Sequence, residues 1–251
     1  IIGGWESPFY FRVLRKLRKR GIPTCIFYES TINSHKFDGL FIRKIRSKIL
    51  SMADFIVTSG TASTEAVLDM GIKSNKIVTL FNPVDVWWFA NFLSNNWTAS
   101  LNGHRYLYVG QLIERKNIRA LIDAFITVRN LNDSLTIVGE GELAIELKGY
   151  VTKLAMTEHI KFTGHHDQEQ VARDYANADT LVLPSTSEVW GLVVNEALAG
   201  GLHVVVSSVA GVAEFIAPMK GTFIVEPTTN GLAQGLIESR SCWQGPISNP
   251  E

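Results

Sequence analysis

The sequence predicts an α/β fold with two parallel-sheet domains. Short apolar runs typical of strands alternate with longer segments whose apolar residues recur at helical spacing. The alternation stops at Asn82, is absent as far as Asn102, and starts again at Tyr106. Such alternation is typical of parallel sheets, because each helix connects two neighbouring strands. We therefore expect four parts, which are a first domain at 1–85, a connection at 86–104, a second domain at 105–240 and a tail at 241–251.

The composition is that of a globular chain without an obvious nucleic-acid partner. Its 251 residues are enough for two domains, and its 24 Lys and Arg are balanced by 24 Asp and Glu. Hydrophobic residues make up 46% of the chain, which excludes a disordered protein. Cys25 and Cys242 lack metal-ligand spacing and fit free thiols in a reducing compartment, so we expect a cytoplasmic protein.

The first domain is expected to contain two basic helices. A helix at 9–20 is predicted because Phe9, Val13 and Leu17 fall on one face, while most other positions are Lys or Arg. A second basic helix is predicted at 37–52. The other expected elements are a helix at 62–70 and strands at 1–4, 24–28, 54–59 and 77–81. The chain begins inside the first strand and without Met, so we expect an incomplete domain in a fragment of a longer protein.

The expected connection is crowded with aromatic side chains and shows no regular period. We interpret it as an interdomain joint filled by aromatic rings; a platform that stacks on a sugar is the alternative. The aromatic residues of this segment are Trp87, Trp88, Phe89, Phe92 and Trp97.

The second domain is predicted to be a Rossmann-like sheet of about six strands, whose ligands bind at the carboxyl ends of the strands. The expected strands are 106–110, 135–138, 160–163, 180–183, 203–207 and 222–225. The expected helices are 118–128, 143–156, 169–176, 192–199 and 212–216.

One strand–loop–helix unit, at 184–201, has the composition of a ligand site. A turn-rich loop leads to Gly191, and the helix that follows ends at Gly200. Its N-terminus offers free N–H groups and partial positive charge to a phosphate, and Gly191 lets a ligand approach the backbone. Glu188 and Glu196 flank this helix start. They are either two solvated carboxylates on an ordinary αβ unit or two residues that face one crevice.

Five stretches of the chain, in order and spacing, resemble the retaining glycosyltransferases of family 4. The resemblance implies the GT-B architecture, in which two Rossmann-like domains face a cleft. It implies transfer of a hexosyl unit from a nucleotide diphosphate sugar to an acceptor such as a glycan or a lipid-linked sugar. It implies neither cofactor nor metal. The stretches are YVGQLIERKN (108–117), LTIVGEGEL (135–143), IKFTGHH (160–166), PSTSEVWGLVVNEALAGG (184–201) and VSSVAGVAEFI (206–216).

The resemblance also implies roles for individual residues. Lys116 matches the family's phosphate-binding lysine, and Glu188 is the expected catalytic residue beside the donor sugar. Glu196 is expected to accept hydrogen bonds from the ribose hydroxyls. The remaining expected donor-binding residues are Gln111, His166 and the backbone N–H groups of Gly191, Leu192 and Val193.

Two of these assignments leave alternatives open. Gln111 stands where the family often has Arg, so it brings no charge to the phosphate; Arg115 either compensates or is solvated. His166 follows His165 in a loop that receives the nucleotide base in the family. Base contact, a solvated loop and a metal ligand are the three readings, and no third metal ligand has matching spacing.

The sequence leaves three rival functions open. Residues 139–144 match the dinucleotide pattern G-x-G-x-x-A and suggest a nicotinamide-dependent oxidoreductase, but Glu140 and Glu142 place negative charge beside the pyrophosphate. A sugar-nucleotide epimerase or a phosphorylase would share the GT-B architecture. A non-catalytic nucleotide-sugar-binding module is the third alternative.

The basic helices at 9–20 and 37–52 predict a further contact. A basic amphipathic face attracts anionic lipid, which together with the family resemblance suggests peripheral attachment at the inner face of the membrane. A solvated face, or one that attracts an anionic acceptor, is the alternative.

Overall fold

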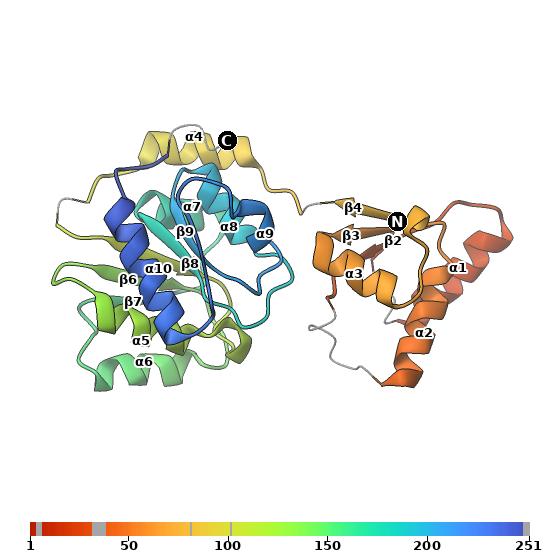
Figure 1. The fold of residues 1–251 in the computed structure, drawn as a ribbon, viewed down its shortest axis with the longest axis horizontal. Helices are drawn as coiled ribbons and strands as arrows, with labels where there is room; N and C mark the ends of the chain where they lie inside the picture. Colours follow the sequence, from red (N-terminus) through yellow and green to blue (C-terminus); the bar gives the residue numbers. More distant parts are fainter. Residues whose placement is uncertain (4–6, 32–38, 81, 101, 248–251) are drawn as a thin grey trace. The chain divides into compact units, whose positions relative to one another are not determined.

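The computed structural model describes residues 1–3, 7–31, 39–80, 82–100 and 102–247. The chain divides into two compact units, Ile1–Pro83 and Val84–Glu251 (Figure 1). Each unit contains its own parallel sheet, so the predicted α/β class is confirmed. Within the described residues, no helix is both long and apolar enough to cross a membrane.

The first unit is a four-stranded parallel sheet in the order β1-β2-β3-β4. Helix α1 begins at Pro8 because the Ser7 side chain accepts a hydrogen bond from the N–H of Phe9. Ile26 and Ile56 face one another across adjacent strands and are fully buried. The elements are β1 (Ile2–Gly3), α1 (Pro8–Lys19), β2 (Cys25–Tyr28), α2 (Leu40–Ser51), β3 (Phe55–Ser59), α3 (Thr61–Asp69), a 3-10 turn (Ser74–Lys76) and β4 (Ile77–Leu80). The expected ends at residues 4, 37–38 and 81 lie outside the described residues.

The second unit is a six-stranded parallel sheet in the order β10-β9-β8-β5-β6-β7. In chain order this is the 3-2-1-4-5-6 arrangement of Rossmann folds, in which the strand order reverses between β5 and β8. The strands are β5 (Arg105–Val109), β6 (Ser134–Val138), β7 (Ile160–Gly164), β8 (Thr180–Leu183), β9 (His203–Ser207) and β10 (Thr222–Val225). The predicted sheet of about six strands is therefore correct.

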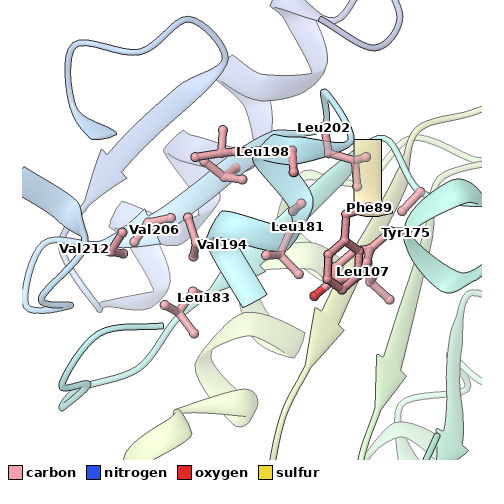
Figure 2. Close-up of a cluster of buried hydrophobic side chains, with 14 of the residues drawn as sticks. Phe89, Leu107, Tyr175, Leu181, Leu183, Val194, Leu198, Leu202, Val206 and Val212 are labelled. Atoms are coloured by element: carbon pink, nitrogen blue, oxygen red, sulfur yellow. The ribbon is translucent and has the colours of Figure 1, made fainter. Parts of the chain in front are cut away.

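Helices cover both faces of this sheet. Successive residues of β5 alternate between the faces, so Leu107 packs in one core while Tyr106 and Tyr108 pack in the other. Figure 2 shows the core that contains Leu107, where Val194 of one helix and Tyr175 of another meet the sheet. The helices are α5 (Ile118–Val128), α6 (Ala144–Lys153), α7 (Gln168–Ala176), α8 (Leu192–Ala199), α9 (Ala213–Ile216) and α10 (Thr229–Cys242), with a 3-10 turn at Glu114–Lys116.

The segment expected as an irregular connection contains a helix, α4 (Val86–Asn96), that packs on the second unit. Asp85 caps it by accepting a hydrogen bond from the N–H of Trp88 at 3.0 Å. Phe89 and Leu93 lie four residues apart and are buried against α7 and α8, whereas Trp87 is 81% exposed. The helical period was hidden because aromatic residues occupy the exposed positions as well as the buried ones.

The segment expected as a tail also packs on the second unit. Helix α10 ends at Cys242, and the ring of Trp243 meets the rings of His104 and His203 edge-on. Farther along, the N–H of Ile247 donates to the carbonyl of Gly201 at 2.8 Å. Ordered packing therefore continues through Ile247.

The second unit should lose stability in acid because of a buried imidazole. His104 lies 2.7 Å from the hydroxyl of Thr180, and burial lowers the pKa of His104 from 6.5 to about 4. Burial also lowers the pKa of the neighbouring His203. Below pH 6.5 the unfolded chain binds a proton at His104 before the folded chain does. The free energy of unfolding should therefore fall by about 3 kcal/mol between pH 6.5 and 4.

Denaturant titrations at pH 7, 5.5 and 4 measure this loss. His104→Gln keeps a hydrogen-bonding side chain without the titrating proton, so its stability should decline less between pH 6.5 and 4. An equal decline in both proteins would show that His104 is not responsible.

Candidate functional site

Two loops meet between β5 and β8, where the strand order of the second sheet reverses. One follows β5 and covers residues 110–117, and the other follows β8 and covers 184–191. The N–H of Thr186 donates to the carbonyl of Arg115 at 2.9 Å, and the Asn117 amide donates to the carbonyl of Pro184 at 3.1 Å. The carboxyl ends of strands at such a reversal are the usual ligand site of open α/β sheets.

Asn117 holds the first loop in place. Its φ of 56° is left-handed, a conformation that Asn tolerates better than most residues. Its side-chain amide also donates to the carbonyl of Pro227 at 2.9 Å, so it joins the loops that follow β5, β8 and β10. Lys116 immediately precedes it and is thereby fixed at the junction. Asn117 was not among the predicted site residues. An Asn directly before a helix is a recognisable sequence signal, although this side chain makes no capping hydrogen bond to its own helix.

The expected phosphate lysine and the expected catalytic glutamate are brought together. The Nζ of Lys116 forms an ion pair and hydrogen bond with Oε2 of Glu188, and each side chain is only 12% exposed. The hydroxyl of Ser185 approaches the same oxygen at 3.4 Å. The Glu188 carbonyl accepts from the N–H of Gly211 at 3.1 Å, which fixes the backbone under the carboxylate.

Gly191 lets the second loop turn into helix α8. Its φ of 104° lies in the left-handed region, and a Cβ at this position would come within 2.6 Å of Leu183. Within the described part of the chain, no side chain caps this helix. The N–H groups of Leu192 and Val193 therefore belong to a helix start suited to an anion.

Glu196 lies one turn farther into α8 and has a partner of its own. The Tyr175 hydroxyl, on α7, donates to Oε2 of Glu196 at 2.7 Å and lies 3.3 Å from the carbonyl of Val193. Burial raises the pKa of Glu196, and the hydrogen bond from Tyr175 opposes that rise. Burial and then the charge of Glu196 raise the pKa of Tyr175 well above its ordinary value, so the phenol stays a neutral donor.

The other expected site residues lie farther apart. Gln111 is exposed at the end of β5, where its carbonyl accepts from the hydroxyl of Tyr108 at 2.8 Å. His166 follows β7, two strands from β5, and its Nδ1 lies 2.6 Å from Oδ2 of Asp174. No group of three metal-binding side chains is found among the residues that the structure describes.

The glycines at 139 and 141 pack the loop after β6 against the loop after β5. A Cβ at Gly139 would lie 1.9 Å from the carbonyl oxygen of Gly110, and one at Gly141 would lie 2.4 Å from that of Leu112. This close approach between backbones accounts for the glycine pattern that matched a dinucleotide fingerprint. Glu140 and Glu142 are both exposed in this loop.

The chain belongs to a glycosyltransferase family. Residues 92–242, more than half of the chain, match the family described as Glycosyl transferases group 1. This match confirms the resemblance that was inferred from the five motifs.

Two curated relatives illustrate the similarity. An uncharacterized glycosyltransferase of Methanocaldococcus jannaschii is 28% identical over 200 residues, which cover 75% of this chain and 51% of that protein. The glycogen synthase of Mycobacterium tuberculosis is 28% identical over 180 residues, which cover 70% of this chain and 42% of that protein. The chain thus spans about half the length of these relatives.

Solved structures show the same fold. Anabaena HepE, in complex with UDP and glucose, matches with a TM-score of 0.76 at 18% identity. The match covers 93% of this chain and 65% of that chain. Together with the two parallel sheets, it confirms the fold class of GT-B glycosyltransferases.

Proposed function

We propose that the protein transfers a hexosyl unit, with retention, from a nucleotide diphosphate sugar bound beside Lys116 and Glu188. The observation that supports this most is the Lys116–Glu188 pair, which lies in the loops leading to the α8 N-terminus. In such a transfer the bond between the anomeric carbon and the diphosphate breaks. Negative charge then grows on the phosphate while positive charge grows at the carbon, so the site needs both signs of charge.

Each residue then has a distinct task. Lys116 and the N–H groups of Gly191, Leu192 and Val193 bind the diphosphate, and they make a metal unnecessary. Glu188 stabilises the positive charge at the anomeric carbon. Glu196 accepts hydrogen bonds from the ribose hydroxyls. Gln111 and His166 complete the donor site at the diphosphate and at the base. The acceptor is a glycan or a lipid-linked sugar.

A non-catalytic nucleotide-sugar-binding module is the second candidate. It is favoured by one observation, which is that all of the proposed donor-binding residues lie in the second unit. Measuring breakdown of the sugar donor separates the two candidates. A binding module would be stabilised by the donor but would not break it down. A sugar-nucleotide epimerase would instead return an isomerised donor.

Binding can be tested on this chain by a thermal-shift screen of UDP, GDP and ADP and their glucose conjugates. At a ligand concentration 100 times Kd, stabilisation should be about 2.7 kcal/mol, which is a shift of several degrees. HepE was solved with UDP, so UDP is the first ligand to try. If no nucleotide stabilises the chain, the proposed function is wrong.

We also propose that α1 and α2 attach the protein to anionic lipid, at the cytoplasmic face of a membrane. Leu40 and Phe41 are 80% and 76% exposed in the first turn of α2, followed by Lys44 and Lys48. A groove of about 390 Å³ between α2 and α3 lies beside them, and its basic lining suits a lipid headgroup. The groove is lined by Leu40, Arg43, Lys44, Ser47, Lys48, Asp69 and Met70.

Co-sedimentation with vesicles tests this attachment. The chain should pellet with vesicles that contain phosphatidylglycerol and stay in the supernatant with pure phosphatidylcholine. Lys44→Glu combined with Lys48→Glu should reduce pelleting at least tenfold, since each basic residue contributes about 1 kcal/mol. Lys148→Glu and Lys153→Glu, on α6 of the second unit, are the matched control. Equal pelleting of both double variants would argue against a role for α2.

A further inference from the structure

The proposed donor site has too little positive charge for a diphosphate if Lys116 acts alone. Lys116 is paired with Glu188, and this pair carries no net charge. The α8 N-terminus adds about half a positive charge. Glu140 and Glu142 are exposed acidic residues in the neighbouring loop. A nucleoside diphosphate is a multiply charged anion, so a second cation is needed.

We propose that Arg115 is this second phosphate-binding cation and that it replaces the charge absent at Gln111. This inference rests on the proposed function. Nη1 of Arg115 lies 3.6 Å from Oε2 of Glu188, so both cations approach the same carboxylate. With Arg115 included, the cluster of Lys116, Arg115 and Glu188 has a net charge of +1.

The backbone of Arg115 is anchored while its side chain remains accessible. The carbonyl accepts from the N–H of Thr186 at 2.9 Å and from its hydroxyl at 3.3 Å. One guanidinium N–H donates to the carbonyl of Ser187 at 3.1 Å. The side chain is 46% exposed, and a guanidinium has five N–H donors, so others are available to a phosphate. Solvation alone does not explain a guanidinium that is aimed at the β8 loop.

Gln111 lies at the end of β5, in the loop that also carries Arg115, but its side chain is uncharged. It follows Gly110 directly, its side chain is exposed, and its carbonyl is held by Tyr108 at 2.8 Å. An arginine side chain at position 111 would start from a fixed backbone in the loop that carries Lys116. On this proposal, an arginine at position 111 should be able to supply the charge that Arg115 supplies.

Calorimetry with the whole chain tests the proposal. The ligands are UDP and uridine, or GDP and ADP with their nucleosides if the thermal-shift screen favours those. Arg115→Ala should weaken diphosphate binding about tenfold, the size of one charge-assisted hydrogen bond, and leave nucleoside binding unchanged. The salt dependence of diphosphate binding should also become shallower. Arg119→Ala is the control, because Arg119 pairs with Glu146 and stacks over Tyr150 on the α5–α6 surface.

A double variant that moves the positive charge from position 115 to position 111 tests the proposal more directly. Gln111→Arg combined with Arg115→Ala should restore diphosphate affinity to within about threefold of the unmodified protein. Unchanged diphosphate affinity in Arg115→Ala would overturn the proposal. Equal losses of diphosphate and nucleoside affinity would also overturn it, because they would indicate that Arg115 only positions the loop. Failure of the double variant to recover would also overturn it. If the unmodified chain binds no diphosphate at all, the proposed function itself is wrong.

Discussion

Lys116→Ala is expected to lower kcat/KM for the sugar donor by about 100- to 1,000-fold, the size of effect seen when a positioned oxyanion donor is removed. The side chain of Lys116 is 12% exposed, so its charge acts where water screens it weakly. Its interaction strengthens as charge builds on the departing phosphate. Diphosphate binding should weaken more than nucleoside binding, because the contact is with phosphate. Donor hydrolysis without acceptor gives the rate, and calorimetry gives the two affinities.

Two further variants separate electrostatics from folding. Removing Lys116 leaves Glu188 as a nearly buried carboxylate without its closest partner, which lowers stability. Lys116→Ala combined with Glu188→Gln should therefore recover the lost melting temperature but not the lost diphosphate affinity. Lys148→Ala, an exposed lysine on α6, controls for net charge. Equal losses of diphosphate and nucleoside affinity in Lys116→Ala would contradict the phosphate role.

The sequence predicted the sheets well because strands carry their signal locally. Runs such as 180–183 and 203–207 contain three consecutive apolar residues each, and every residue of both strands is buried, which matches strands covered on both faces. Lys116 and Glu188 were predicted as site residues for a related reason, since each lies in a short motif that follows a strand. Helix α4 was missed because its pattern of burial depends on α7 and α8, which only the folded chain brings near.

The contacts that shape the site could not be predicted, because they join distant positions. Tyr175 precedes Glu196 by 21 residues and lies on another helix. No local pattern marks it as a hydrogen-bond donor to that carboxylate. The approach of Arg115 to Glu188 spans a much larger gap in the sequence and joins two loops. Gly139 shows the converse case, because its local pattern matches a dinucleotide motif, whereas its structural role is the close contact with Gly110.

Glu188→Gln and Glu196→Gln should have opposite kinetic signatures. Glu188 opposes a positive charge that exists only in the transition state, so its loss should lower kcat by about 100-fold or more. The ion pair between Lys116 and Glu188 leads to a second expectation, which concerns UDP affinity. Glu188 competes with the diphosphate for Lys116 and Arg115, so Glu188→Gln should bind UDP at least as tightly as the unmodified protein. Slow turnover with undiminished nucleotide affinity would be the distinguishing result.

Glu196→Gln should instead raise KM about tenfold with little change in kcat, because ribose contacts are made in both the ground state and the transition state. Its affinity for UDP should fall toward the affinity of the unmodified protein for 2′-deoxy-UDP, since both changes remove a hydroxyl–carboxylate contact. Burial raises the pKa of Glu196, so acidification should protonate it and weaken UDP binding in the unmodified protein. That pH dependence should be lost in Glu196→Gln, because glutamine does not titrate. If both variants keep normal kcat, KM and pH dependence, Glu188 and Glu196 are ordinary carboxylates on an αβ unit.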